Sequence, residues 1–330
     1  MRRSGWAAWL RLLVGAGVLV ALVWHLGSAA FLAGLRRIDA GTLLAALAIG
    51  LLTTVLSAWR WCLVARGLGL RLPLGRAVAD YYRALFLNAV LPGGVLGDVH
   101  RAVGHRGGAG DLGRGVRAVI LERAAGQLVL LVCGAAVLLV RPSPVSSALA
   151  HALASPGVAL PAAALCAVAL AAAGWWCLRR RTGHTERAEA RQGLPSRAVW
   201  PGVALSSVAV LAGYLTMFVL AARVAGVDAP TAELVPLVVL ALLAMALPVN
   251  IGGWGPREGA AAWAFGAAGL GAAQGLTASV VYGVLAFAAS LPGALVLLVR
   301  WAAGARVDRR PQFELEERVL AEQGAPQRRT

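Results

Sequence analysis

Two arginines that follow Leu-Pro pairs have the residue type and spacing that point most clearly to chemistry. The segment LPGGVLGDVHR covers residues 91–101, and LPVNIGGWGPR covers residues 247–257. In each, an arginine stands nine positions after the proline, which gives Arg101 and Arg257. A guanidinium binds phosphate oxygens with two parallel hydrogen bonds, so the pair predicts a site for a lipid phosphate. The alternative is that both arginines only anchor their segments at a membrane surface.

The prolines and glycines of the two segments predict interrupted helices. Pro92 and Gly97 break the first segment, and Pro248 and Gly253 break the second at the same spacing. Discontinuous helices at matching places in two halves of an apolar chain are typical of transporter binding sites. Irregular backbone at membrane depth is tolerated only next to protein or water, so we expect both breaks to line a cavity.

Acidic residues stand beside both arginines. Asp98 and Glu258 can hold Arg101 and Arg257 in ion pairs, or they can take up protons or bind a cationic headgroup. The two acids are not at equivalent positions, because Trp254 stands where Asp98 stands in the first copy. The repeat is therefore expected to be functionally asymmetric.

Further polar residues lie within or beside apolar segments and are candidates for contacts to a headgroup. These are Arg60, Asn88, Glu122, Arg123 and Asn250. For Glu122 and Arg123 the alternative is a self-contained pair or side chains that reach to the membrane surface. For Arg60, which lies between Trp59 and Trp61, the alternative is a role as an interfacial anchor. For the asparagines it is a hydrogen bond between helices.

The composition indicates an integral membrane protein. Hydrophobic residues make up 59% of the 330, and charged residues only 14%, which a soluble domain of this size could not bury. The formal charge of +16 comes entirely from arginine, because the sequence has no lysine. These arginines stand mostly between apolar runs, as in membrane proteins, so we expect no nucleic-acid partner.

The apolar runs predict an all-α, polytopic helix bundle. Six runs come close to or reach the roughly 20 residues that cross a bilayer. They are residues 12–32, 42–58, 118–140, 158–178, 199–222 and 276–299. Residues 77–91 run into the first Leu-Pro segment and residues 234–270 contain the second; both are predicted to be re-entrant hairpins, or further spans, giving up to eight.

Arginine-rich loops predict the topology. If both termini are cytoplasmic, the loops after residues 58 and 178 lie inside, as the positive-inside rule requires. The Leu-Pro segments then enter from opposite faces, which is the arrangement of inverted-topology repeats. We expect a single domain over residues 1–310, a charged cytoplasmic tail over residues 311–330, and a location in the plasma membrane.

Catalytic signatures are absent from the sequence. There is no HExxH, GxSxG or Walker motif. The four cysteines have neither CxxC spacing nor nearby histidines, so they are interpreted as small apolar residues. We therefore expect no metal and no cofactor, while enzyme activity stays open.

In order along the chain, these motifs resemble the lysylphosphatidylglycerol synthase transmembrane family, also called the flippase-like domain family. The first family motif is matched by Asn88, Leu91, Pro92, Gly97, Asp98 and Arg101. An acid-arginine pair is matched by Glu122 and Arg123. The second motif is matched by Pro248, Gly252, Gly253, Gly255, Arg257 and Glu258. The resemblance covers about residues 10 to 300.

The resemblance implies a protein that moves a lipid headgroup between leaflets through a polar cavity. The lipid class stays open between phospholipid, aminoacyl-lipid, glycolipid and polyprenyl-linked sugar. About 30 residues follow the last predicted span, so we expect no fused aminoacyl transferase and a separate lipid-modifying enzyme as a partner. Two alternatives are an intramembrane lipid-pyrophosphate phosphatase using Asp98 and His100, and a membrane scaffold without transport.

Overall fold

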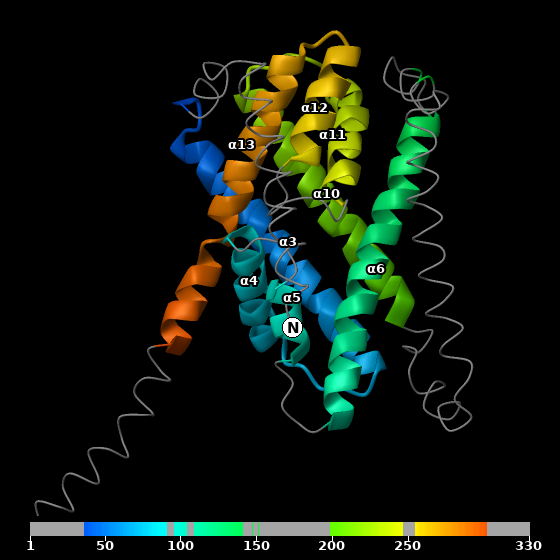
Figure 1. Ribbon diagram of the computed structural model, residues 1–330, viewed down its shortest axis with the longest axis vertical. Coiled ribbons are helices and arrows are strands. Elements are labelled where there is room, and N and C mark those ends of the chain that lie inside the picture. The colour runs from blue at the N-terminus through cyan, green and yellow to red at the C-terminus, as the bar shows by residue number, and fades with distance from the viewer. Residues whose placement is uncertain are drawn as a thin grey trace, which may run out of the picture.

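The computed structural model describes residues 36–90, 96–103, 109–140, 147, 151, 199–246 and 255–301. Every regular element in these ranges is helical, which confirms the all-α prediction (Figure 1). The helices are α3 (Ala40–Gly67), α4 (Leu74–Val90), α5 (Leu96–Val103), α6 (Ala109–Val140), α10 (Trp200–Val224), α11 (Thr231–Met245), α12 (Pro256–Ala267) and α13 (Ala272–Ser290). The spans predicted at residues 12–32 and 158–178 lie outside the described residues, as does the tail 311–330.

Four helices are long and apolar enough to cross a membrane. They are Ala40–Gly67, Gly113–Val140, Trp200–Val224 and Ala272–Trp301, the last of which includes a second helical segment after α13. All four coincide with predicted spans, but the predicted end of the first one at Ala58 is wrong. Helix α3 continues to Gly67, because Arg60 and Trp61 are buried against other helices and need not reach the membrane surface.

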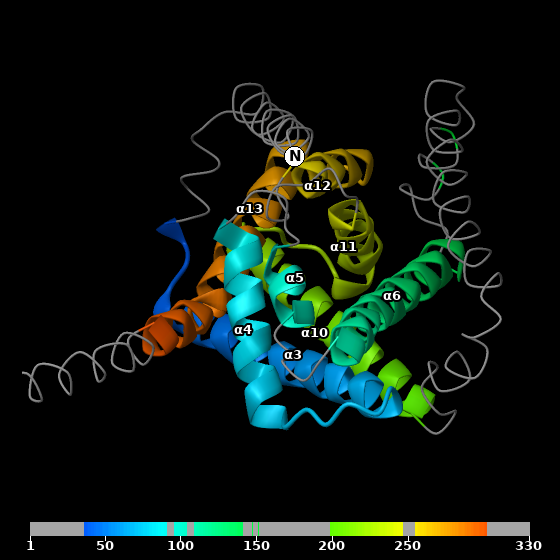
Figure 2. The same ribbon diagram turned by 60° about the horizontal axis from the view of Figure 1, so that its bottom comes forward.

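The shorter helices are distributed between the two ends of the bundle. Helices α4 and α5 pack against each other in the lower half, and α11 and α12 pack against each other in the upper half (Figure 1). Seen from the lower end, α5 lies inside a ring formed by the other helices (Figure 2). Asp98 and Arg101 of α5 accordingly lie buried in the interior of the molecule.

Two hydrophobic clusters hold these halves together. The upper one joins α3, α10, α11, α12 and α13, and it includes the stacked rings of Phe218 and Tyr282, whose centroids are 4.7 Å apart. The lower one joins α3, α4 and α6 around the buried Trp61, Val64 and Ala118. Large apolar side chains on the outside, such as Leu139 and Leu205, are exposed, as expected for a surface that faces lipid.

Glycines bring the central helices into close contact. A Cβ atom on Gly50 of α3 would lie 2.5 Å from Cβ of Ala289 on α13, and one on Gly213 of α10 would lie 2.3 Å from Cγ2 of Thr53. In a membrane, helices associate through such close packing, because lipid provides no hydrophobic drive for their association. The interfaces between α3, α10 and α13 therefore depend on these small residues.

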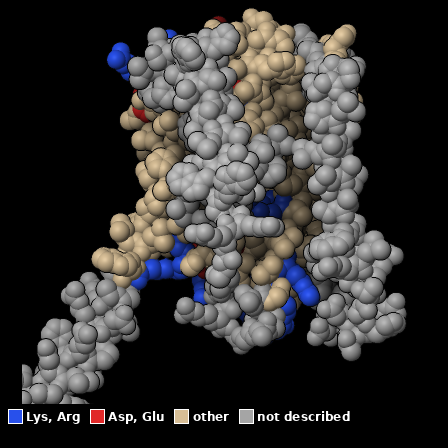
Figure 3. Space-filling model, in the orientation of Figure 1, with Lys and Arg blue, Asp and Glu red and all other residues tan. Residues whose placement is uncertain are grey.

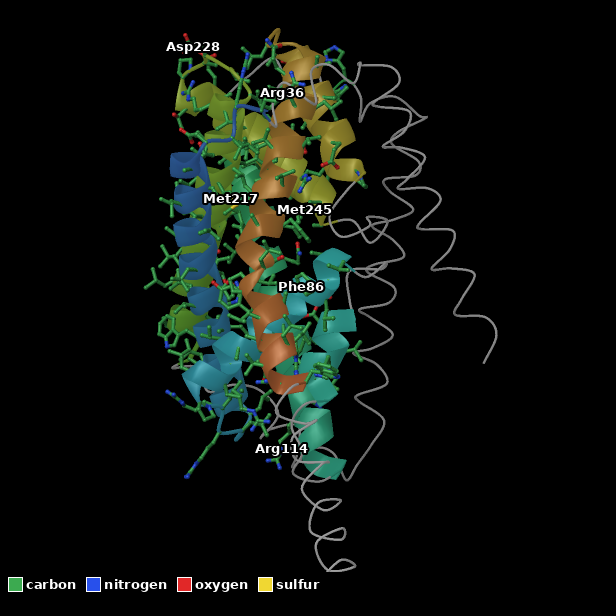
Figure 4. All side chains as sticks on the ribbon, turned by 90° about the vertical axis from the view of Figure 1, so that its left-hand side faces the viewer. Arg36, Phe86, Arg114, Met217, Asp228 and Met245 are labelled. Carbon is green, nitrogen blue, oxygen red and sulfur yellow. The ribbon has the colours of Figure 1, made fainter. Side chains whose placement is uncertain are left out.

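Charged residues differ between the two ends. The end of α3 with the loop after it, the starts of α4 and α6, and the end of the segment 292–301 lie toward the lower end (Figure 1). These parts of the chain contain Arg66, Arg71, Arg76, Arg114, Arg117 and Arg300. The upper end carries basic and acidic residues together, including Arg36 and Asp228 (Figure 4). On the face shown in Figure 3, most basic side chains accordingly lie in the lower half. Figure 4 also shows that Phe86 on α4 and Met245 on α11 lie near the middle, where α4 and α11 end.

Candidate functional site

A completely buried carboxylate, Glu122 on α6, lies at the centre of the lower half. Its Oε1 atom accepts hydrogen bonds from Nε of Arg60 at 3.0 Å, from Nη2 of Arg60, and from the hydroxyl of Tyr81 at 3.3 Å. Its Oε2 atom accepts one from Nη2 of Arg101 at 3.3 Å. Arg60 also donates to Oγ of Ser207 at 3.0 Å. Glu122 thus joins five helices: α3, α4, α5, α6 and, through Arg60, α10.

A second carboxylate, Asp98 on α5, connects to the same network. Its Oδ1 atom lies 2.6 Å from Nη2 of Arg101, and its Oδ2 atom is paired with Arg123 and accepts from Nδ2 of Asn88 at 3.1 Å. The carbonyl oxygen of Asn88 in turn accepts from the backbone N–H of Gly97 at 2.8 Å. The end of α4 is therefore held against the start of α5. We call Arg60, Tyr81, Asn88, Asp98, Arg101, Glu122 and Arg123 the lower cluster.

Arg101 has a special place in the lower cluster. Only 2% of its surface is exposed, and its guanidinium lies over the rings of Trp61 and Tyr81, at 4.9 Å and 4.2 Å from their centroids. Such cation–π contacts hold the flat group in one orientation. Its Nε and Nη1 atoms are buried and have no hydrogen-bond partner among the described residues. A buried guanidinium with unused donors is suited to bind an oxyanion, which supplies acceptors for them.

The upper cluster is smaller and consists of Gly255, Arg257, Glu258, Ser279 and Tyr282. Nε of Arg257 donates to Oε1 of Glu258 at 2.9 Å and to Oγ of Ser279 at 3.0 Å, and Nη2 also pairs with Glu258. Oε2 of Glu258 accepts from the backbone N–H of Gly255 at 2.7 Å and so caps the start of α12. Arg257 lies over Tyr282, 5.0 Å from its centroid.

Tyr214 on α10 stands between the two clusters. It is close enough to interact electrostatically with Arg60, Glu122 and Tyr81 below and with Tyr282 above. Although it is surrounded by the bundle, its side chain is only partly buried. Tyr214 therefore brings a polar side chain within electrostatic range of both clusters.

The two clusters differ in charge. In the lower cluster Arg60, Arg101 and Arg123 pair with two carboxylates among the described residues, Asp98 and Glu122, so one positive charge is in excess there. In the upper cluster Arg257 pairs with Glu258, and the two charges cancel. The lower cluster is therefore the part of the described site whose charge favours an anion.

Several sequence expectations can be compared with this geometry. The ion pairs expected for Asp98 with Arg101 and for Glu258 with Arg257 form. The interfacial anchor considered for Arg60 is wrong, because Arg60 is 5% exposed and bonded to Glu122. Pro92, Pro248, Asn250 and Gly253 lie outside the described residues.

Glu122 and Arg123 are not a self-contained pair. Their carboxylate and guanidinium make their ion pairs with other helices, Glu122 with Arg60 and Arg101, and Arg123 with Asp98. Sequence reasoning missed Ser207, Ser279 and the place of Trp61 beneath Arg101. Serines are common in apolar helices and carry no spacing pattern that would single out these two, so no signal pointed to them.

Gly97 is required by the contact between α4 and α5. A Cβ atom at this position would lie 2.3 Å from the carbonyl oxygen of Ala84 and 2.6 Å from its Cα. We expect Gly97→Ala to lower the free energy of unfolding by about 1–3 kcal/mol, because backbone atoms must move. Thermal unfolding of the purified protein in detergent measures this. The control is Gly113→Ala on α6, where the added Cβ meets nothing within 4 Å; equal unfolding temperatures would contradict the contact.

Long apolar helices with ion pairs buried among them define a class of protein. The chain is a multi-pass membrane protein whose charged side chains face the bundle interior, where such residues usually mark a ligand or ion pathway. The family model described as lysylphosphatidylglycerol synthase TM region matches residues 8–293, and the chain belongs to this family. No curated protein matches the chain. The family is associated with lipid flipping.

Proposed function

We propose that this protein moves the phosphate-bearing headgroup of a membrane lipid between leaflets, with Arg101 as the residue that binds the phosphate. The observation that carries the proposal is the pair of unused, buried donors on Arg101 within a cluster that has one excess positive charge. An arginine at membrane depth costs at least about 2.5 kcal/mol, so unused donors there need a reason. A phosphate oxyanion supplies the missing acceptors.

The path for the headgroup runs from the lower cluster past Tyr214 to the upper cluster. Tyr214 is close enough to interact electrostatically with residues of both clusters, and its hydroxyl gives a polar group between them. Arg257 then offers a second cationic side chain near the other end. The acyl chains stay in the surrounding lipid while only the headgroup enters the bundle. The class of lipid among phospholipids, aminoacyl-lipids, glycolipids and polyprenyl-linked sugars is left to experiment.

Two short helical hairpins form the gates of this path in the proposal. Helix α4 has 17 residues and α11 has 15, so at 1.5 Å per residue each is shorter than the roughly 30 Å of a bilayer core. Both end near the middle of the molecule, α4 from below and α11 from above (Figure 4). These features support re-entrant segments entering from opposite faces, related as inverted repeats.

The same charges support an orientation. At the lower end the described exposed charged residues are arginines, whereas at the upper end arginines and acidic residues occur together. Under the positive-inside rule the lower end is cytoplasmic, which puts both chain termini inside. A plasma-membrane location and a separate lipid-modifying enzyme belong to the same proposal.

The contacts of Asp98 favour binding over catalysis. Both of its oxygens are engaged, one by Arg101 and the other by Arg123 and Asn88. A nucleophile or general base needs a lone pair directed at the substrate. The phosphatase alternative has no such group at Asp98.

A proteoliposome assay tests the proposal. Purified protein is reconstituted with fluorescent lipids of different headgroups, and the fraction accessible to an external quencher is followed with time. We expect wild type to move at least one phosphate-bearing lipid faster than protein-free vesicles do. The Arg101→Gln variant is expected to lose this acceleration, and Arg71→Gln, an exposed change at the lower end, to keep it. If wild type and Arg101→Gln move every lipid equally slowly, the proposal fails.

A further inference from the structure

A third group of charged side chains lies outside both clusters, where the helical segment 292–301 that follows α13 meets α4. Oδ1 of Asp80 accepts a hydrogen bond from Nη1 of Arg300 at 2.7 Å and lies 3.2 Å from Nη2 of Arg83. Its Oδ2 atom lies 3.8 Å from Nε of Arg76. His100 on α5 is close enough to interact with Arg83, Asp80 and Arg300. We call the three arginines Arg76, Arg83 and Arg300 the basic triad, and Asp80 is the aspartate that they share.

The charges of this group do not balance. Arg83 and Arg300 both pair with the carboxylate of Asp80, and no second carboxylate pairs with these two arginines among the described residues. The Nε atom of Arg83 is buried, and in the described part of the chain it has no hydrogen-bond partner. Arg83, Arg300 and Asp80 together therefore carry an excess of one positive charge. An oxyanion beside Asp80 would neutralise that excess.

The surroundings of the triad are those of a lipid headgroup region. The side chains of Arg76 and Arg300 are 60% and 41% exposed, so a ligand can reach them. Next to Arg300, the side chains of Leu298, Val299 and Trp301 are all exposed. Tryptophan and arginine side by side at the end of an apolar helix are typical of the membrane–water interface. Basic side chains are visible at this level of the molecule in Figure 3.

We propose that the basic triad binds the phosphate group of an anionic phospholipid in the leaflet at the lower end of the bundle. Arg76 and Arg300 contact the phosphate oxygens, Arg83 supports them from the buried side, and the acyl chains lie along Leu298 and Trp301. The site is separate from the translocation path: it holds a lipid where α4 meets the segment 292–301 and does not require that lipid to cross. Because the chemistry is that of a phosphate oxyanion, inorganic phosphate is the competing ligand.

Binding to the purified full chain in detergent tests the site. Apparent affinities come from the rise in unfolding temperature with ligand concentration. The probes are dioctanoyl phosphatidylglycerol, dioctanoyl phosphatidylcholine and inorganic phosphate. Measurements are made in both wild-type and Arg101→Gln chains, so that binding at the lower cluster is separated from binding at the triad. We expect phosphatidylglycerol to bind more tightly than phosphatidylcholine in both chains; tighter binding by inorganic phosphate would instead identify a soluble anion as the ligand of the same site.

Substitutions at the triad and at Asp80 are expected to change the affinity for phosphatidylglycerol in opposite directions. Arg300→Gln and Arg83→Gln are expected to weaken phosphatidylglycerol binding at least about tenfold, because each removes a charged donor. Arg71→Gln, at an exposed arginine of the same end, is expected to leave it unchanged. Asp80→Asn is expected to tighten binding, because the competing carboxylate is removed. If the arginines served only to bind Asp80, Asp80→Asn would lower stability without raising affinity, and this result would overturn the site.

Crosslinking provides a second measurement that does not depend on stability. A phosphatidylglycerol with a diazirine in its acyl chain, added to vesicles containing wild type, is expected to label residues 292–301. The labelling is expected to fall in Arg300→Gln and to persist in Arg71→Gln. Equal labelling of all three chains contradicts the proposal.

Discussion

Replacing Glu122 by glutamine is expected to lower the free energy of unfolding by about 3–5 kcal/mol, because it leaves a buried arginine without its counter-charge. Glu122 has no exposed surface and is the only carboxylate that pairs with Arg60 within the described residues. Glutamine has nearly the same shape, so packing is preserved and only the charge is lost. Thermal unfolding in detergent, followed by the loss of the monodisperse peak in size-exclusion chromatography, measures the effect.

A double-mutant cycle separates this ion pair from other effects of the substitution. Arg60→Gln/Glu122→Gln removes both charges, while Arg101 keeps Asp98 as its partner. We expect the double variant to be more stable than the sum of the two single effects predicts, because neither charge is then left alone. Glu233→Gln, at an exposed glutamate in the first turn of α11, is the control and should unfold near the wild-type temperature. A Glu122→Gln chain as stable as this control would contradict the buried network.

The sequence predicted the helices better than it predicted their ends. Apolar runs identify spans because the bilayer sets a minimum length, so Trp200–Val224 and Ala272–Trp301 were expected within a few residues. The pattern Trp59-Arg60-Trp61 ended the second predicted span too early. An arginine between tryptophans has the same appearance in sequence at a membrane surface and in a buried network. Only the partner, Glu122, 62 residues away, decides between them.

The candidate site was predictable where local motifs specify it. Asp98 and Arg101 lie on one short helix, and Arg257 and Glu258 are neighbours, so their pairs follow from spacing alone. The contacts of Arg60 with Ser207 and of Arg257 with Ser279 connect helices that are far apart in sequence. Such pairs depend on how α3 crosses α10 and how α12 packs on α13. Those crossings are set by glycines and alanines, whose spacing recurs throughout the sequence and is not specific.

The expected functional asymmetry has a physical basis in the two networks. Glu258 uses one oxygen to cap α12 and the other to hold Arg257, so it fixes the backbone as well as the arginine. Asp98 holds Arg101 from one side only and leaves two donors unused. Their positions relative to the Leu-Pro pairs differ because one acid caps a helix and the other does not. The upper cluster is therefore built for support, and the lower cluster for binding in the proposed mechanism.

The two arginines of the repeat are expected to respond differently to replacement by glutamine. In Arg101→Gln, Asp98 keeps its ion pair with Arg123, and Glu122 keeps its pair with Arg60. No carboxylate loses its last arginine, so we expect the free energy of unfolding to change by no more than about 1–2 kcal/mol. Translocation is expected to fall at least about a hundredfold, because two charge-assisted hydrogen bonds to the phosphate are lost.

For Arg257→Gln we expect the main effect on stability and not on lipid binding. Glu258 loses the only arginine that pairs with it in the described part of the chain, while remaining completely buried. The expected cost is about 3–5 kcal/mol of unfolding free energy. A loss of translocation in this variant would therefore follow the loss of folded protein, and it should be partly restored by assaying at a lower temperature.

Measuring unfolding temperature and translocation rate for both variants decides whether Arg101 binds the lipid or only supports the fold. A stable, inactive Arg101→Gln chain and an unstable Arg257→Gln chain are the expected pair of results. Arg101→Lys refines the comparison, because lysine keeps the charge but has no group in the place of the unused Nε atom. We expect it to translocate faster than Arg101→Gln and slower than wild type. If Arg101→Gln unfolds as readily as Arg257→Gln, then Arg101 is a structural residue and the headgroup must bind elsewhere.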